Sequence, residues 1–347
     1  MFNKKIWLLA AVLLTSFSIA SSFNNNSASK FSSNQSNTPI IIGYSSWAGW
    51  WPWAIAESEG LFAKHNISDI ELKWYDDYTR SMEDLASGQI DGNCQTFNDT
   101  IGFAKDAVKG EVVVLVNDNS AGNDKIIAAQ GINRVLDLKG KQIAIEEGVV
   151  EDYLLTLALK QSDISRDDVR IINAETGAAV EAFAVGQVDA VGAFAPFWLT
   201  ALNREGSREI TSSANFPGAI ADVLVVTQQL VDKSPTTVQA LVDTWFDILD
   251  FMEKNPSKSE EIMMKRAGIN RQQLRLFKAG TKMFDYKDNL EAFSKGNNMK
   301  HLSHAADSII SFLRQEFDSI EKKPDLSQII NPNFIKAHQP RKQSLKT

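Results

Sequence analysis

Short apolar runs alternate with amphipathic stretches from Pro39 onward. The runs Ile40–Tyr44 and Ile70–Trp74 have the length and β-branched content of buried strands. Further strands are predicted at Gln89–Thr96, Val112–Val116 and Lys125–Ala129, and helices at Trp53–His65, Thr79–Ser87 and Asp99–Val108. Strands that alternate with helices predict a mostly parallel sheet with helices on both faces.

The alternation starts again after the segment "DLKGK". Strands are predicted at Gln142–Ile145, Val169–Ile172 and Val188–Gly192, and helices at Val150–Gln161, Gly177–Val185 and Pro196–Asn203. Val223–Val226 is predicted to be a strand that returns to the first sheet. After Pro235 the pattern predicts an almost wholly helical chain.

These patterns predict an α/β protein of two lobes with a ligand cleft between them. We expect the first lobe to comprise residues 39–131 and 221–325, including the C-terminal helices, and the second lobe to comprise 132–220. Residues 326–347 are polar, and we expect a partly loose C-terminal tail. A length of 347 residues is consistent with two units.

The N-terminal region predicts export. Residues 1–20 combine two lysines, an apolar stretch and a small-residue cleavage site, as in a secretory signal peptide, and the Ser/Asn-rich residues 21–38 predict a flexible linker. The only cysteine, Cys94, lies far from the cleavage site, so a lipid anchor there is excluded and the thiol is interpreted as a packing residue. We therefore expect a periplasmic protein and, in the absence of features to the contrary, a monomer.

Charge narrows the class of ligand. The net charge of −7 argues against nucleic acid as a partner. In open α/β sheets, ligands bind beyond the carboxyl ends of the strands, so the loops that follow the predicted strands are the candidate site. These loops and the start of the returning strand carry nine carboxylates and one nearby basic residue, Lys125. The nine are Asp76, Asp77, Asp99, Asp118, Asp124, Glu146, Glu147, Glu175 and Asp222.

A cluster of four tryptophans follows the first predicted strand, in the segment "SSWAGWWPW". The tryptophans of such a cluster either pack in the hydrophobic core or line a ligand-binding site. We expect Trp47 or Trp50 to line the ligand site, and Trp51 and Trp53 to pack against the sheet. Asp99 and Glu147 could equally serve only as helix N-caps or helix-dipole partners.

Five segments, in order along the chain, carry a resemblance to a known family. They are "YSSWAGWWPWAIAESEGLFAKH", "LASGQIDGNCQTFNDTI", "VLDLKGKQIAIEEGVVEDYLL", "AAVEAFAVGQVDAVGAFAPFW" and "ADVLVV". Together they resemble the solute-binding proteins of nitrate/sulfonate/taurine-type ABC importers. The resemblance implies the two-lobed periplasmic-binding-protein fold (type II-like), a small-molecule ligand and a membrane permease as partner. Many relatives have a Trp-Glu-Pro turn where this chain has Phe194-Ala195-Pro196, so the carboxylate at that turn is absent.

An acidic, tryptophan-lined cleft favours a small nitrogen cation, with guanidinium as the best candidate, because carboxylates bind its N–H edges while indole faces stack on its plane. Nitrate, a sulfonate or taurine, urea and a thiamine-like heterocycle remain alternatives. The candidate ligand-binding residues are Ser46, Trp47, Trp50, Asp77, Asn98, Asp99, Asp124, Glu146, Glu147, Phe194 and Asp222.

An enzyme of small metabolites on the same fold is the rival class. The sequence contains no nucleophile elbow, phosphate-binding loop or dinucleotide fingerprint, and no set of residues spaced to bind zinc or calcium. We therefore expect no catalytic residues, no metal and no cofactor.

Overall fold

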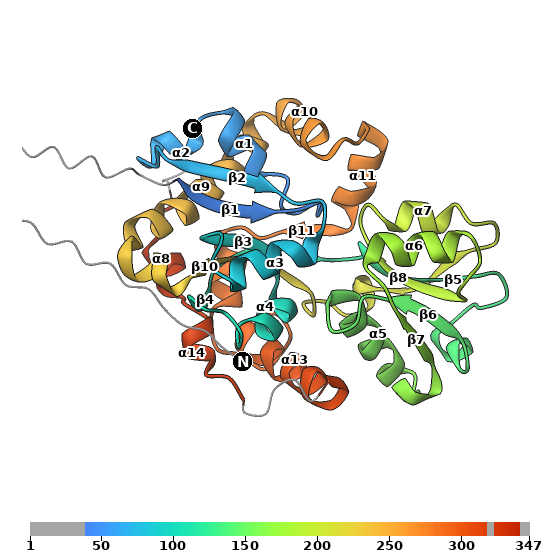
Figure 1. Cartoon of the computed structure of the whole chain (residues 1–347). Coiled ribbons are helices and arrows are strands. Elements are labelled where there is room, and N and C mark those ends of the chain that lie inside the picture. Colours follow the sequence, from blue (N-terminus) through green and yellow to red (C-terminus); the bar gives the residue numbers. More distant parts are fainter. Residues whose placement is uncertain (1–38, 318–322, 341–347) are drawn as a thin grey trace, which may run out of the picture. The chain divides into compact units, whose positions relative to one another are not determined.

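The computed structural model describes residues 39–317 and 323–340 (Figure 1). The predicted signal peptide 1–20 and the predicted linker 21–38 lie outside the described residues. Within the described part of the chain, no helix combines the length and the apolar character that a membrane span requires.

One sheet has six strands in the order β11-β4-β10-β3-β1-β2. Its strands are β1 (Ile40–Tyr44), β2 (Ile70–Trp74), β3 (Gly92–Thr96), β4 (Glu111–Ser120), β10 (Ala221–Thr227) and β11 (Thr281–Met283). The second sheet has five strands in the order β7-β6-β8-β5-β9. They are β5 (Asp124–Ala128), β6 (Gln142–Ile145), β7 (Arg170–Asn173), β8 (Ala190–Phe194) and β9 (Arg208–Ser212).

Helices flank both sheets (Figure 1). Those before β10 are α1 (Trp53–Ser58), α2 (Leu61–Lys64), α3 (Tyr78–Ala86), α4 (Phe97–Phe103), α5 (Val150–Gln161), α6 (Thr176–Ala184) and α7 (Trp198–Leu202). Those after β10 are α8 (Gln228–Lys233), α9 (Pro235–Lys254), α10 (Pro256–Ala267), α11 (Arg271–Ala279), α12 (Tyr286–Ala292), α13 (Leu302–Phe317), α14 (Leu326–Ile329) and α15 (Asn333–Ala337).

Both sheets are mixed, whereas the sequence predicted mostly parallel ones. β1 pairs in parallel with β2 and β3, but β10 runs antiparallel to β3 and β4. In the second sheet β6 pairs in parallel with β7 and β8, and β5 runs antiparallel to β8 and β9. The antiparallel strands β5 and β10 are those at which the chain enters each sheet from the other one.

The chain passes from the first sheet to the second at residues 121–123, between β4 and β5. The predicted lobe boundary at residue 131 placed 124–128 in the first lobe, but this strand pairs within the second sheet. The return occurs before β10, whose seven residues are all buried between β3 and β4. We propose the remaining lobe limits as the sequence predicted them.

The core of the first sheet is rich in aromatic side chains. Trp51 and Trp53 are fully buried, as expected from the sequence. The Trp53 ring lies 5.2 Å from that of Trp245 on α9, and the Trp51 ring lies 5.8 Å from that of Phe277 on α11. These contacts fix the start of α1 and hence the loop that precedes it.

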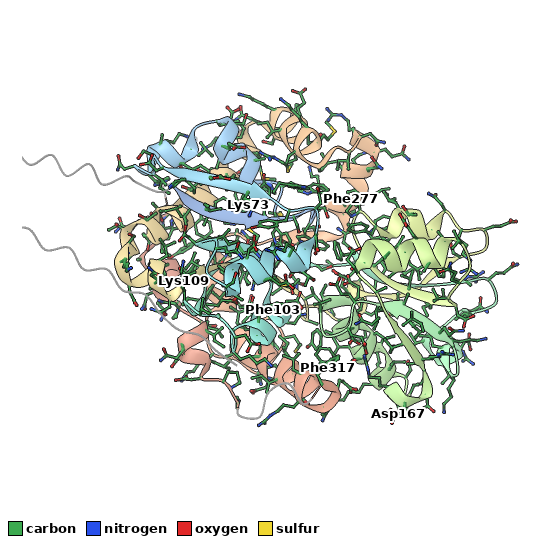
Figure 2. All side chains as sticks on the ribbon, viewed as in Figure 1. Lys73, Phe103, Lys109, Asp167, Phe277 and Phe317 are labelled. Atoms are coloured by element: carbon green, nitrogen blue, oxygen red, sulfur yellow. The ribbon has the colours of Figure 1, made fainter. Side chains whose placement is uncertain are left out.

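Side chains also connect helices that flank different sheets. Phe277 contacts Trp198 of α7 with ring centroids 5.5 Å apart, and the guanidinium of Arg166 lies 5.4 Å from the ring centroid of Phe317 on α13. Figure 2 labels Phe277 and Phe317. The Tyr153 hydroxyl on α5 donates to Ser308 Oγ on α13 at 3.0 Å. These contacts link the second sheet's helices to the C-terminal helices.

The segment after residue 325 is more ordered than the sequence predicted. α14 and α15 bury Ile329, Phe334 and Ile335, and Ile330 forms a bridge with Val113 of β4. The His338 side chain bonds Asp243 of α9 through Nδ1 at 2.7 Å. The expectation of a partly loose tail is therefore wrong for residues 326–338, because their few apolar side chains pack against β4 and α9 of the first sheet's core.

Candidate functional site

The loop after β1 is held against β4 by a close backbone approach. A Cβ atom on Gly49 would lie only 1.8 Å from Oδ2 of Asp118, so the position requires glycine. Trp47 Nε1 donates a hydrogen bond to Asp118 Oδ1 at 3.0 Å, and Trp50 N donates to the Trp47 carbonyl at 3.1 Å. The loop thereby orients two indole rings beside a buried carboxyl group.

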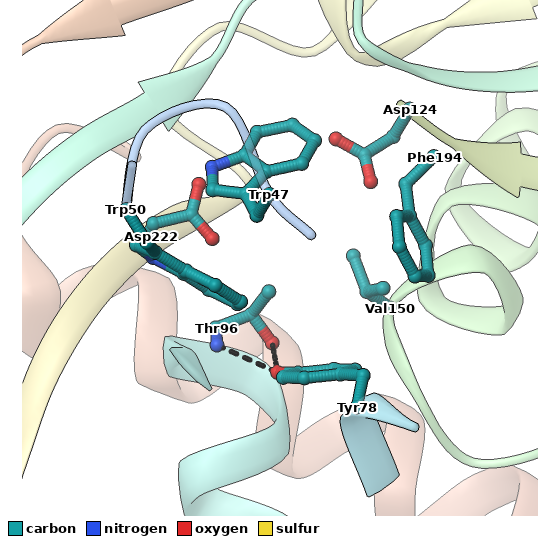
Figure 3. Close-up of a pocket in the computed structure, with 8 residues that line it drawn as sticks. All are labelled: Trp47, Trp50, Tyr78, Thr96, Asp124, Val150, Phe194 and Asp222. Atoms are coloured by element: carbon teal, nitrogen blue, oxygen red, sulfur yellow. Dashed lines mark hydrogen bonds between the residues drawn. The ribbon is translucent and has the colours of Figure 1, made fainter. Parts of the chain in front are cut away.

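A small pocket opens beside this loop (Figure 3). It is narrow, with room for about one water molecule. Its lining residues are Trp47, Trp50, Tyr78, Thr96, Asp124, Val150, Phe194 and Asp222. A larger ligand would enter only if these side chains moved apart.

Four aromatic rings form much of the pocket wall (Figure 3). Ring centroids are 6.3 Å apart for Trp47 and Trp50, 5.5 Å for Trp50 and Tyr78, and 6.2 Å for Tyr78 and Phe194. The first three residues lie on the loop after β1 and on α3, whereas Phe194 ends β8 of the second sheet. Elements of both sheets therefore contribute to one aromatic wall.

Two carboxylates, Asp222 on β10 and Asp124 on β5, line the same pocket from different sheets. Both are buried, and Oδ2 of each has no hydrogen-bond partner among the described residues. The eight lining residues in the described part of the chain include no lysine, arginine or histidine. Lys125 pairs with Glu209, and its Nζ lies 5.0 Å from the Trp198 ring centroid.

Three more carboxyl groups lie buried around this pair, namely Asp99, Asp118 and Glu151. Asp99 accepts a hydrogen bond from the Tyr78 hydroxyl at 2.8 Å, whereas both oxygens of Glu151 have no partner within the described residues. Burial raises the pKa of Asp99 and of Asp118 to about 7, and that of Asp124 to about 6.

The pKa values of Asp222 and Glu151 are raised well above the ordinary range, first by burial and then by neighbouring carboxylates. Asp118 and Asp124 repel a charge on Asp222, and Asp124 and Asp99 repel one on Glu151. The site is therefore a buried concentration of acidic groups, in which added negative charge is unfavourable and added positive charge is favourable.

The predicted site residues divide into three groups. Trp47, Trp50, Asp124, Phe194 and Asp222 line the pocket. Asn98 and Asp99 lie directly behind it, where Asn98 Nδ2 donates to Asp99 Oδ1 at 2.5 Å, and Glu146 accepts from Thr79 Oγ1 at 2.6 Å. The third group, Ser46, Asp77 and Glu147, is not part of the pocket lining.

Two members of this third group have other partners. Asp77 is the exposed N-cap of α3 and accepts from the Arg80 backbone N–H at 3.1 Å. Glu147 is exposed and bonds Arg166 Nη2 at 3.2 Å. Ser46 is partly exposed. The structure therefore separates these three positions from the buried carboxyl cluster.

The sequence did not single out Tyr78, Thr96, Val150 or Glu151. Tyr78 stands at the end of a strand-end loop that was recognised, and its hydroxyl accepts the Thr96 backbone N–H at 2.8 Å. Val150 and Glu151 begin α5, which follows β6 after a short loop. Their position at a helix N-terminus beyond a strand was the available signal.

Metal coordination is not indicated. Across residues 39–317 and 323–340, no group of three or more His, Cys, Asp or Glu side chains has an arrangement that could hold a metal ion.

Two mixed sheets flanked by helices, with a small pocket lined from both, define the periplasmic-binding-protein fold. The chain belongs to the NMT1-like family, whose model matches residues 33–265. Family and fold confirm the resemblance and the fold class expected from the sequence.

Relatives and solved structures agree with this assignment. The chain is 27% identical over 287 residues to a binding protein of Brucella abortus (strain 2308), covering 80% of this chain and 86% of the relative. It is 26% identical over 226 residues to the taurine-binding periplasmic protein of Escherichia coli (strain K12), covering 63% and 69%. The crystal structure of the periplasmic aliphatic sulphonate binding protein SsuA from Escherichia coli superposes with a TM-score of 0.68 at 20% identity, covering 85% and 92%.

Proposed function

We propose that the protein is an extracytoplasmic receptor that captures a small nitrogen cation, guanidinium or a close analogue, and delivers it to the permease of an ABC importer. One observation carries the choice of a cation. Asp124 and Asp222 direct unpartnered, buried carboxylate oxygens at one small pocket, and no basic residue is among its described lining residues. A ligand with positively charged N–H groups would satisfy both oxygens.

The names of relatives suggest taurine or a sulphonate as ligands. A sulfonate or nitrate in this pocket would lie among buried carboxyl groups. Trp47 Nε1 already bonds Asp118, so among the described indole groups of the lining only Trp50 Nε1 has no partner to give up. An anion beside a carboxylate at about 4 Å is repelled by roughly 4 kcal/mol at an effective dielectric constant of 20. Taurine would place its ammonium group favourably but its sulfonate unfavourably.

The aromatic wall supports a planar cation. Indole and phenol faces attract a cation by roughly 0.5–2 kcal/mol each, depending on how far it is desolvated. A quaternary ammonium ion would gain the same attraction, but it has no N–H group for Asp124 or Asp222. Urea would donate to the carboxylates without neutralising them, and a thiamine-like heterocycle would require a wider opening of the pocket than guanidinium does.

The proposal also covers the protein's location, its oligomeric state and its partner. The N-terminal signal peptide, periplasmic location, monomeric state and permease partner are inferred from the sequence and from the family. A receptor captures its ligand by hinge closure between two units, and the chain crosses between the sheets at residues 121–123 and before β10. Asp124 and Asp222 each stand beside one of these crossings.

Enzyme activity on the same fold is less well supported. Cys94 is the chain's only thiol, and burial raises its pKa well above the ordinary value, which makes it a poor nucleophile. Incubation with a bound ligand followed by mass spectrometry tests this alternative. A converted product would favour an enzyme over a receptor.

Calorimetry tests the proposed ligand class. The wild-type protein should bind guanidinium and should bind nitrate, taurine and urea more weakly or not at all. Asp222→Asn should reduce guanidinium affinity by about 2–5 kcal/mol, because one carboxylate partner of a buried charge is removed. Asp77→Asn is the matched control, since Asp77 is an exposed helix cap outside the pocket.

The control should leave the affinity unchanged. Tight binding of nitrate or taurine with no response to guanidinium would refute the cation proposal while leaving the solute-binding class intact. An equal loss of affinity in Asp77→Asn and Asp222→Asn would refute the assignment of the pocket.

A further inference from the structure

Five carboxyl groups meet around one pocket although they come from five different elements. All five side chains are buried, with exposed fractions of 0–2%. They are Asp99 on α4, Asp118 on β4, Asp222 on β10, Asp124 on β5 and Glu151 on α5. Five full negative charges in such a volume would be strongly unfavourable without counter-ions.

Four of the five lie as two pairs of neighbouring carboxyl groups. Asp118 and Asp222 are register partners on β4 and β10, and Oδ2 of each has no hydrogen-bond partner among the described residues. Asp124 and Glu151 are the corresponding neighbours on the second sheet's side, where Asp124 Oδ2 and both Glu151 oxygens also have no partner within the described residues. Two carboxyl groups can share a hydrogen bond only when one of them carries a proton.

Other groups around the cluster do not neutralise it. Tyr78, Trp47 and Asn98 supply neutral donors to Asp99 and Asp118. Lys125 pairs with Glu209, and Cys94 is a buried thiol beside Asp118 and Asp222.

On the outer side of the cluster lies Glu146, which bonds Thr79, with Asp77 and Glu175 as further negative groups near it. The charged groups that face the five carboxyls within the described residues are thus mostly acidic. Protons are therefore the available counter-ions of the empty pocket.

We propose that the receptor captures its cation in exchange for a proton held by these carboxyl pairs. The inference rests on the proposed cationic ligand and adds that one proton leaves for each cation that binds. A monovalent cation enters, an O–H bond of one carboxyl group breaks, and the proton leaves to solvent. The total charge of the pocket stays the same through binding, so the low-dielectric site never holds an additional uncompensated charge.

The direction of the pKa shifts agrees with this exchange. Burial raises the pKa of Asp99 and Asp118 to about 7 and that of Asp124 to about 6, so the empty pocket is partly protonated near neutral pH. A bound cation lowers the pKa of each carboxyl group beside it. Affinity should therefore rise as the pH increases from about 5.5 to 7.5.

Titration calorimetry in two buffers measures the exchange directly. Guanidinium chloride is titrated into the full mature protein at pH 7 in phosphate and in Tris, whose ionisation enthalpies differ. The difference in observed enthalpy should correspond to about 0.5–1 proton released per cation. Affinity should increase several-fold, up to about tenfold, from pH 6 to pH 7.

Two variants test which carboxyl group releases the proton. Glu151→Gln removes one member of the Asp124 pair with little change in shape, and it should reduce the number of protons released. Glu111→Gln is the matched control, because Glu111 is also buried but bonds Gln95 within the first sheet and does not line the pocket. It should release as many protons as the wild type, and circular dichroism verifies that both variants are folded.

The outcomes separate the two proposals. Guanidinium binding with equal enthalpies in both buffers and equal affinity at pH 6 and 8 would overturn proton exchange and leave the cation receptor standing. No guanidinium binding at any pH, with binding of nitrate or taurine, would overturn both. A proton count unchanged in Glu151→Gln would overturn the assignment to the Asp124–Glu151 pair.

Discussion

The contact between Gly49 and Asp118 gives a prediction that is independent of the ligand. In Gly49→Ala, the new Cβ would lie 1.8 Å from Oδ2, 2.1 Å from Cγ and 2.5 Å from Oδ1 of Asp118. Ordinary contacts of a Cβ atom begin near 3.4 Å, so either the loop or the carboxyl group must move by more than an ångström. Neither has free space, since Asp118 is fully buried between strands and Trp47 is bonded to it.

We expect Gly49→Ala to reduce the free energy of unfolding by about 1–3 kcal/mol, the usual range for overpacking a filled core. Urea unfolding followed by circular dichroism measures this change, and tryptophan fluorescence reports displacement of Trp47 and Trp50. Gly102→Ala is the matched control. Gly102 lies within α4, and a Cβ there would meet nothing closer than 3.9 Å, so this variant should be neutral or slightly stabilising.

A double variant tests the cause. Gly49→Ala combined with Asp118→Ala removes the three atoms that would lie nearest to the new Cβ. The two substitutions should therefore be non-additive, and the double variant should be more stable than the sum of the single changes by about 0.5–3 kcal/mol. An unchanged unfolding curve and fluorescence spectrum in Gly49→Ala, or strict additivity in the double variant, would refute the steric reasoning.

Two further predictions concern stability. Burial raises the pKa of Asp99, Asp118 and Asp124 above 3.8, so the folded ligand-free protein binds more protons than the unfolded chain. Its free energy of unfolding should therefore fall as pH rises from about 4 to 7. Urea unfolding across this range, in which a constant or rising stability would contradict the prediction, provides the measurement. Arg166→Ala should lower the unfolding free energy by about 3–5 kcal/mol, because it leaves the fully buried Asp152 carboxylate unpaired, whereas the exposed Arg134→Ala should have little effect. Thermal unfolding of both variants checks the contrast, and similar midpoints would count against it.

Local patterns predicted the regular elements well where one face or the whole strand is apolar. β1, β2, β6 and α5 have the same limits in the structure as in the sequence analysis. The apolar runs that define them end at glycine or polar residues, so their limits are visible locally. The helix expected over 53–65 is divided at Gly60, whose φ of 65° is left-handed and ends α1.

Elements stabilised by distant partners were missed. β4 continues through Asn117–Ser120, a polar run that was interpreted as a loop, because β10 and β11 pair with it on both sides. β11 itself is three residues long and lies within a region predicted to be helical. β9 also had no local signal, since only two of its five residues are buried. Pairing partners far along the chain determine all three.

The same limit applies to the site. The rule that ligands bind beyond the carboxyl ends of strands identified the loops that surround the pocket, including those of Trp47, Asp124 and Phe194. It could not tell which carboxylate in a loop points inward, because that depends on strand register and on helix phase. Glu146 and Glu147 are neighbours, yet the first is mostly buried against Thr79 and the second is exposed beside Arg166.

The first turn of α5 gives the clearest reason to regard the pocket's charge as functional. Glu151 and Asp152 are adjacent and both fully buried. Asp152 points to Arg166, which bonds it through two nitrogens, so the fold supplies a cation to a carboxylate that serves structure. Glu151 points instead to the carboxyl cluster, where both of its oxygens have no partner among the described residues.

Replacing such an uncompensated group by an apolar one would usually stabilise a fold. Five acidic groups line or surround the pocket and all have raised pKa values, so charging them in the ligand-free protein is unfavourable at neutral pH. Under the proposed function, a bound cation would remove this unfavourable term, and the stability that the ligand-free receptor lacks would contribute to its affinity for the cation. Ligand binding should consequently stabilise the protein more at pH 8 than at pH 6, and a thermal-shift series with guanidinium at both pH values measures the difference.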